Sequence, residues 1–305
     1  MCEFKRGSYF SDKFLCELVY EVYEINGKKE GTYKEYYPNG KISKICNYVD
    51  DKLNGEHKVF SMSGLFNICN YVNGKKNGEY KQYFISQSQN LYYSCNYIND
   101  LRNGVEKKYY QNGKIESIET FVNNSLNGEY KLYDQVGKRI TIGHYVNGLK
   151  DGEWIEYYKN EKEREVSNYT NGKLNGHYKK YFENGQLKTA SNYTNDKLNG
   201  HYEEYFENGQ LKTASNYTND KLSGHYKEYH QNGQLKFASN YTNDKLSGEY
   251  KEYFENGQLK IISNYTNDKL NGEYEEYHQN GQLKTLSNYV NGKKICYNYV
   301  KCKKK

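Results

Sequence analysis

The sequence predicts an all-β fold, an elongated single-sheet solenoid or meander of antiparallel β-hairpins that is twisted or curled. Three observations predict it: a glycine returns at a fixed interval, turn residues recur between the glycines, and aromatic residues stand in fixed columns. Eight of the ten glycine intervals are 24 residues, and the other two are 23 and 26. The eleven anchor glycines are Gly31, Gly55, Gly78, Gly104, Gly128, Gly152, Gly176, Gly200, Gly224, Gly248 and Gly272. Such a period indicates stacked repeats that contact only their neighbours.

Each repeat reads as one hairpin, with the anchor glycine at its start. In the repeat that begins at Gly200, residues 201–206 read as a strand and residues 210–217 as the return strand. Asn208–Gly209 lies between them and predicts a type I′ turn, which requires positive φ at both central residues. A second polar turn at residues 218–222 leads to the next glycine. Strands joined by short turns pair antiparallel with their sequence neighbours.

Tyrosine columns support strands rather than helices. Tyr205 stands five residues after its glycine, Tyr217 stands near the end of the return strand, and both positions recur in the other repeats. The chain has 38 tyrosines, which predicts a thin core of Tyr, Phe and Leu with the phenol groups reaching its edge. We expect the Tyr and Leu columns to line the inner face. Equivalent side chains in adjacent repeats should lie about 10 Å apart, because two strands separate them.

The repeats predict three segments. Residues 1–26 resemble a degenerate repeat that caps the N-terminal end of the stack. Residues 27–295 hold the eleven tandem repeats. Cys296 stands where the next anchor glycine is due, so residues 296–305 are expected to form a C-terminal capping strand and a basic tail.

Composition excludes several classes of protein. The net charge is +6, and four lysines of the tail supply four of these charges, so the rest is close to neutral. This argues against a nucleic-acid-binding protein. The sequence lacks an apolar run of 18 residues and an N-terminal apolar segment, so we expect neither a transmembrane helix nor secretion. The expected location is cytoplasmic, with the seven cysteines reduced.

The repeat pattern resembles a known family. The unit G-x-Y-x-x-Y-[YFH]-x-N-G-x-L, followed by Y-x-N-[GD]-K-x-x-G, is similar to the MORN-repeat variant, a β-hairpin module. The resemblance covers residues 27–295 and implies a hairpin-repeat fold. The bias toward Asn, Lys and Tyr is also similar to that of multi-copy repeat proteins of giant viruses of amoebae.

Columns of chemically active side chains are interpreted as structural. Cysteines share one column in three adjacent repeats, and histidines share another. At about 10 Å separation neither column can form disulfides or hold a metal ion. We therefore expect no metal, no cofactor and no catalytic residue. The cysteines are Cys46, Cys69 and Cys95, and the histidines are His177, His201 and His225.

Lysine columns are the strongest candidates for a binding surface. One column contains Lys188, Lys212, Lys236, Lys260 and Lys284, and a second, at the turns, contains Lys173, Lys197, Lys221, Lys245, Lys269 and Lys293. Lysine rows suit contact with an anionic surface. The alternative is that they provide solubility and protect the sheet edges.

These observations favour a non-enzymatic repeat scaffold for multivalent protein–protein interaction, with an unknown partner and no small-molecule substrate. The alternative is peripheral binding to an anionic, phosphoinositide-type membrane through the lysine rows. Carbohydrate binding is a third hypothesis, but the aromatic clefts it requires are rich in Trp, and this chain has one, Trp154.

Overall fold

The computed structural model describes residues 2–11, 14–85 and 89–295, so the expected C-terminal capping strand and basic tail lie outside the described residues. The chain divides into two compact units, Met1–Asp151 and Gly152–Lys305. The strands described within them pair antiparallel, which confirms the predicted all-β hairpin fold. Among the described residues, no helix has the length and apolarity needed to cross a membrane.

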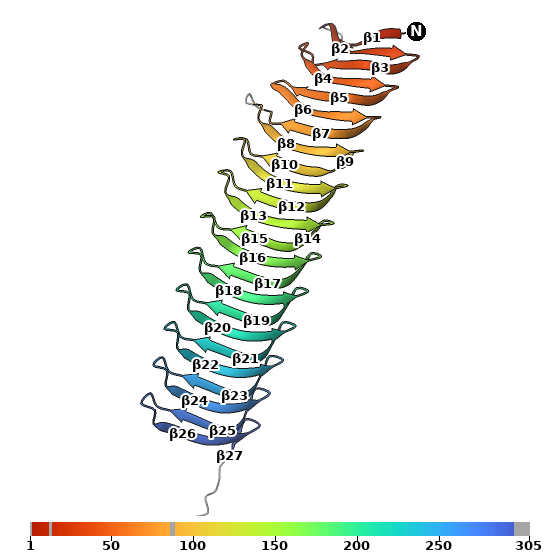
Figure 1. Ribbon diagram of the computed structural model, residues 1–305. Helices are drawn as coiled ribbons and strands as arrows, with labels where there is room; N and C mark the ends of the chain where they lie inside the picture. Colours follow the sequence, from red (N-terminus) through yellow and green to blue (C-terminus); the bar gives the residue numbers. More distant parts are fainter. Residues whose placement is uncertain (1, 12–13, 86–88, 296–305) are drawn as a thin grey trace, which may run out of the picture. The chain divides into compact units, whose positions relative to one another are not determined.

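The first unit is an open sheet of hairpins in which successive strands are neighbours (Figure 1). Residues 1–26, predicted as a degenerate repeat, contain its first two strands, which pair antiparallel. The strands are β1 (Cys2–Ser11), β2 (Phe14–Ile25), β3 (Lys28–Tyr36), β4 (Ile42–Val49), β5 (Lys52–Ser61), β6 (Gly64–Val72), β7 (Lys75–Tyr83), β8 (Leu91–Ile98), β9 (Leu101–Arg102), β10 (Gly104–Tyr109), β11 (Ile115–Val122), β12 (Ser125–Tyr133), β13 (Arg139–Val146) and β14 (Leu149–Lys150).

The second unit is also an open antiparallel sheet, and its pairing register repeats from one hairpin to the next. The strands are β15 (Gly152–Tyr157), β16 (Glu163–Thr170), β17 (Lys173–Tyr181), β18 (Leu187–Thr194), β19 (Lys197–Tyr205), β20 (Leu211–Thr218), β21 (Lys221–Tyr229), β22 (Leu235–Thr242), β23 (Lys245–Tyr253), β24 (Leu259–Thr266), β25 (Lys269–Tyr277), β26 (Leu283–Val290) and β27 (Lys293–Ile295).

The anchor glycine does not start the hairpin, as the sequence suggested, but sits inside the outgoing strand. Strand β21 begins at Lys221, three residues before Gly224. Its pairing with β20 passes from Tyr217–Leu222 to Ser215–Tyr226, so extra residues bulge around the glycine. All eleven anchor glycines have φ between 70° and 133°, a region that L side chains rarely adopt. The 24-residue period therefore marks the recurrence of a β-bulge at the anchor glycine.

The type I′ turn predicted at Asn208–Gly209 lies instead at the other turn of the repeat. Phe206–Gln210 forms a longer loop in which Gly209 has φ of 84°, whereas Asn208 is not in the positive-φ region. The Oδ1 of Asn208 accepts a hydrogen bond from the Gln210 N–H at 3.0 Å. A loop with three central residues needs positive φ only at its last one, so the type I′ prediction is wrong here. The two-residue turn is Asn219–Asp220, with φ of 50° and 66°.

Aromatic side chains gather on one face of each sheet, which we call the aromatic face. Tyr202 and Tyr217 meet edge to face, with ring centroids 5.8 Å apart. Ten of the eleven repeats carry an equivalent ring pair. Tyr205, predicted for the same face, instead donates a hydrogen bond to Glu203 on the opposite face, because neighbouring strand residues alternate between faces. The inner-face prediction thus holds for only one of the two tyrosine columns.

The most buried column of the repeats consists of small residues beneath these rings. Ser215 is 3% exposed and pairs across the strands with Tyr202 and Tyr226. Cys46 in the first unit occupies the equivalent position and is 1% exposed. A ring pair can lie close to the backbone only where the side chain below is small. The core is therefore thin, as expected, but its centre is Ser and Cys rather than Tyr, Phe and Leu.

Hydrogen bonds between neighbouring repeats run along the turn edge of the sheet. The Asp220 N–H donates to the Leu198 carbonyl at 2.9 Å, and the Asp220 carboxylate accepts the Leu198 N–H at 2.7 Å. Asp196, Asp244 and Asp268 make the same pair of bonds to the preceding repeat. The aspartate thus satisfies a backbone N–H beside the bulge that the sheet itself leaves unpaired.

The loop edge has its own inter-repeat contacts. The Asn232 amide donates to the Glu255 carbonyl at 3.0 Å, and the Tyr158 hydroxyl donates to the Tyr181 carbonyl at 2.7 Å. Each contact joins one repeat to the next. Both edges of the sheet are therefore held in register by polar side chains, whereas the middle is held by ring packing.

The turn-edge bonds predict a graded effect of substitutions at Asp220. Asp220→Ala removes the acceptor for the Leu198 N–H. It also replaces aspartate, which tolerates positive φ, by alanine, which does not. We therefore expect a loss of about 1–2 kcal/mol in the free energy of unfolding. Asp220→Asn keeps both an acceptor oxygen and tolerance of positive φ, so it should lie within about 0.5 kcal/mol of wild type. Urea unfolding followed by circular dichroism measures both, and equal losses would contradict the assignment.

The aromatic face predicts loss of stability at alkaline pH. Burial raises the pKa of Tyr48, Tyr71 and Tyr97 to about 12, from an ordinary value of 10.0. In the unfolded chain these phenols lose their protons near the ordinary value, so their stabilising effect is complete below pH 10.0 and is lost as the pH rises to about 12. Phenolate absorbance and sheet circular dichroism should change together in this range. Full ionisation near the ordinary pKa with the sheet intact would contradict the prediction.

Candidate interaction surfaces

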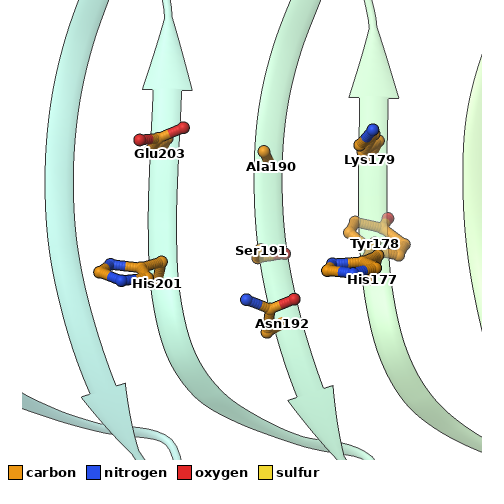
Figure 2. A pocket seen from close by; sticks show the side chains of 8 residues that line it. All are labelled: His177, Tyr178, Lys179, Ala190, Ser191, Asn192, His201 and Glu203. Carbon is orange, nitrogen blue, oxygen red and sulfur yellow. The ribbon is translucent and has the colours of Figure 1, made fainter.

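The face opposite the aromatic rings is polar, and in the second unit it carries an open row of charged and imidazole side chains. Figure 2 shows His177, Lys179 and Ala190 on the near side of their strands, with Tyr178 and Ser191 behind them. We call this side, in the second unit, the polar face. The alternation follows from strand geometry, since Tyr178 lies between His177 and Lys179 in β17.

The first predicted lysine column is paired with glutamates. Lys212 lies 2.9 Å from Glu204, and the next three members of the column repeat this contact at 2.6–2.7 Å. Lys188 differs because its repeat has Lys180 where the others have glutamate, and its ammonium lies 5.6 Å from the Phe182 ring centroid. Four of the five lysines are therefore partly neutralised, at partly exposed sites where each pair adds at most about 1 kcal/mol.

The second lysine column lies at the turn edge, and Lys197, Lys221, Lys245 and Lys269 are exposed there. Each follows directly after the aspartate that bonds to the preceding repeat, for example Asp220 before Lys221. Residues 176–295 contain 15 lysines and 15 acidic residues. The structure thus places acids beside most lysines of both rows, and the net field of these repeats is small.

The cysteine column is buried and free of disulfides. Cys46, Cys69 and Cys95 are 1–4% exposed, and all three are free thiols. Burial raises the pKa of each thiol, so the reactive thiolate is disfavoured. This confirms the interpretation of the column as small buried packing residues. The side chains of Cys2, Cys16, Cys296 and Cys302 lie outside the described part of the chain.

Histidines occupy three different environments. His57 takes a place in the aromatic column and contacts Tyr71 edge to face at 5.4 Å, and burial lowers its pKa. His230 replaces an aromatic residue at the loop edge, where its Nε2 lies 3.4 Å from the Tyr253 carbonyl oxygen. His177, His201 and His225 are exposed on the polar face. Within the described residues, no group of three His, Cys, Asp or Glu side chains could hold a metal ion.

One repeat of the first unit replaces the ring pair by a buried ion pair. Glu106 stands where the other repeats have Tyr, Trp or His and is 1% exposed. Its Oε2 accepts hydrogen bonds from Arg102 at 3.0 Å and from the Tyr93 hydroxyl at 2.6 Å. The Arg102 guanidinium in turn lies 3.9 Å from the centroid of the Phe121 ring. Because these contacts satisfy the carboxylate, we interpret the cluster as structural; losing either charge would leave the other buried without its partner.

The polar face contains a shallow hollow between β17 and β19. It encloses about 230 Å³ and is lined by His177, Lys179, Ala190, Asn192, His201 and Glu203 (Figure 2). Lys179 pairs across the strands with Ala190, and Ala190 pairs with Glu203. The alanine leaves space between the two charged side chains. Sequence reasoning named the histidines but missed this hollow, although the alternation of Ala with charged residues in adjacent strands could have indicated it.

Sequence comparison identifies the repeats. The sequence model of the MORN repeat variant family matches seven segments of 22 residues each. They are residues 29–50, 102–123, 174–195, 198–219, 222–243, 246–267 and 270–291. No curated protein matches the chain.

The solved structures that match this chain are only distantly similar to it. A crystal structure of TcdB2-TccC3-Cdc42 matches at 10% identity, covering 94% of this chain and 18% of that chain, with a TM-score of 0.20. A structure of the Photorhabdus luminescens Tc holotoxin pore matches at 10% identity, covering 91% of this chain and 20% of that one, with a TM-score of 0.18. This chain spans about a fifth of their length, and at such TM-scores the likeness carries no information on function. The seven matched segments cover 154 of 305 residues, and the chain therefore belongs to the MORN repeat variant family.

Proposed function

We propose that this protein is a non-enzymatic, cytoplasmic scaffold that binds protein partners multivalently along its repeats. The array fits a repeat-scaffold role, which in this family means protein or membrane binding. The observation that carries the proposal is the aromatic face, where Tyr202–Tyr217 and its equivalents recur in adjacent repeats about 10 Å apart. Each pair offers the same half-exposed ring surface.

The chemistry of these rings suits protein contacts. Tyrosine is enriched at protein interfaces because it presents a large, rigid apolar area together with a hydroxyl group. Tyr226 and Tyr241 are each half-buried within their own sheet, so a partner gains contact area without ordering them further. Several weak contacts on one sheet multiply in affinity when a single partner spans them.

The alternative function is peripheral attachment to an anionic membrane. The exposed lysines of the turn edge, such as Lys221 and Lys245, favour it because they lie along one side of the sheet. The aspartate beside each of these lysines opposes it, because attraction to anionic lipid depends on the net positive charge near the surface.

Removal of whole repeats tests the multivalent scaffold. After a partner has been captured with the full chain and identified, deletion of residues 200–223 should weaken its binding by a constant factor. Deletion of residues 200–247 should weaken it by about the square of that factor, because free energies of equivalent contacts add. Isothermal titration calorimetry with the purified partner measures both.

The matched control is deletion of residues 224–247, which removes the same number of residues and should match the first deletion. A partner lost completely on one substitution within residues 190–270 would contradict the proposal. Sedimentation with anionic vesicles that is abolished by salt, combined with no effect of repeat number on any protein partner, would establish the membrane alternative.

A further inference from the structure

The polar side of both sheets follows a charge rule. Where glutamate follows the anchor glycine and lysine stands two residues later on the same strand, the two side chains form an ion pair. The pairs are Glu56–Lys58, Glu79–Lys81, Glu129–Lys131 and Glu249–Lys251, with N–O distances of 2.5–2.8 Å. In these four repeats the lysine is thus neutralised within its own repeat.

Three consecutive repeats of the second unit break this rule. His177, His201 and His225 replace the glutamate, and all three imidazoles are exposed. Lys179 and Lys227 remain, and within the described part of the chain neither lies within ion-pair distance of a carboxylate. The middle repeat has Glu203 in place of the lysine.

These side chains form a continuous patch. Strand pairing places Lys179, Ala190, Glu203, Ala214 and Lys227 in one row across β17 to β21. The three histidines form a parallel row, two residues earlier on each outgoing strand. Because alanines separate the charged residues, the row is open, and the hollow between Lys179 and Glu203 is part of it (Figure 2).

We propose that this patch binds an extended acidic peptide segment of a partner protein. The patch comprises His177, Lys179, His201, Glu203, His225 and Lys227. Lys179 and Lys227 are four strand spacings apart, about 19 Å. An extended chain of about six residues spans that distance. Carboxylates near both ends of the segment meet the two lysines, while Glu203 in the middle accepts a peptide N–H.

The surrounding charges favour a narrow chain over a membrane surface. Glu153 and Glu249 occupy the histidine column on either side of the patch, and Glu203 lies within it. A broad anionic surface would approach all three carboxylates together with the cations. A peptide lying along the row meets the lysines and histidines and avoids the flanking glutamates, which gives specificity through charge complementarity.

A synthetic peptide with two aspartates at each end and two glycines between them tests the proposal on the full chain. Calorimetry in low salt should show binding. Lys179→Gln and His177→Glu should each weaken this binding by up to about fivefold, the latter because the new carboxylate neutralises Lys179 as Glu249 neutralises Lys251.

Lys251→Gln is the matched control, since this lysine occupies the same column but is already paired with Glu249, and it should leave the affinity unchanged. Glu203→Gln should strengthen binding, a gain that misfolding cannot produce. Equal effects of Lys179→Gln and Lys251→Gln, or equal binding of a peptide with Asn in place of Asp, would each overturn the proposal. So would salt-sensitive binding to anionic vesicles that depends on Lys179 while the peptide fails to bind. Because the aromatic face is separate, these failures would leave partner binding through that face intact.

Discussion

An edge-to-face ring pair over a small side chain is the interaction on which ten of the eleven repeats depend. In each unit the strands form a single sheet, and the ring side chains of a repeat pack over the backbone of that same repeat. Tyr202 and Tyr217 do this in one repeat, with Ser215 beneath them. The Ser215 hydroxyl has no hydrogen-bond partner among the described residues, so an apolar thiol fits equally well there. This explains why Cys46, Cys69 and Cys95 take the same place in the first unit.

Near-identical repeats must also be held in register, and the polar edges do this. Ring packing alone would tolerate a shift by one whole repeat, because every repeat offers the same surface. The bonds of Asp220 to Leu198 and of Asn232 to Glu255 fix each turn and loop to its neighbour. The Glu106–Arg102 pair adds a buried contact that occurs at a single repeat position, and a shifted first unit would leave its charges unpaired.

The surfaces available for binding are those whose side chains are not already engaged in contacts between repeats. Four lysines of the first column are engaged with neighbouring glutamates, as Lys212 with Glu204 shows, whereas the lysines of the turn edge stay exposed beside aspartates. Two surfaces remain: the repeated rings of the aromatic face, and the histidine patch of the polar face with the open lysines Lys179 and Lys227. The first suits multivalent contact because it is repeated. The second suits selective contact because it is confined to three repeats.

The sequence by itself determined the repeat, the antiparallel hairpins and the burial of the cysteine column, because a strict period and recurrent turn residues leave few alternatives. It did not determine which tyrosine column shares a face with which, or which turn is type I′. Both depend on the bulge at glycines such as Gly224 and on the three-residue loop at Glu207–Gly209, which shift the alternation of side chains in ways that spacing alone does not reveal. Only the tertiary structure paired Lys212 with Glu204 and left Lys179 open, because ion pairing depends on which side chains adjacent strands bring together.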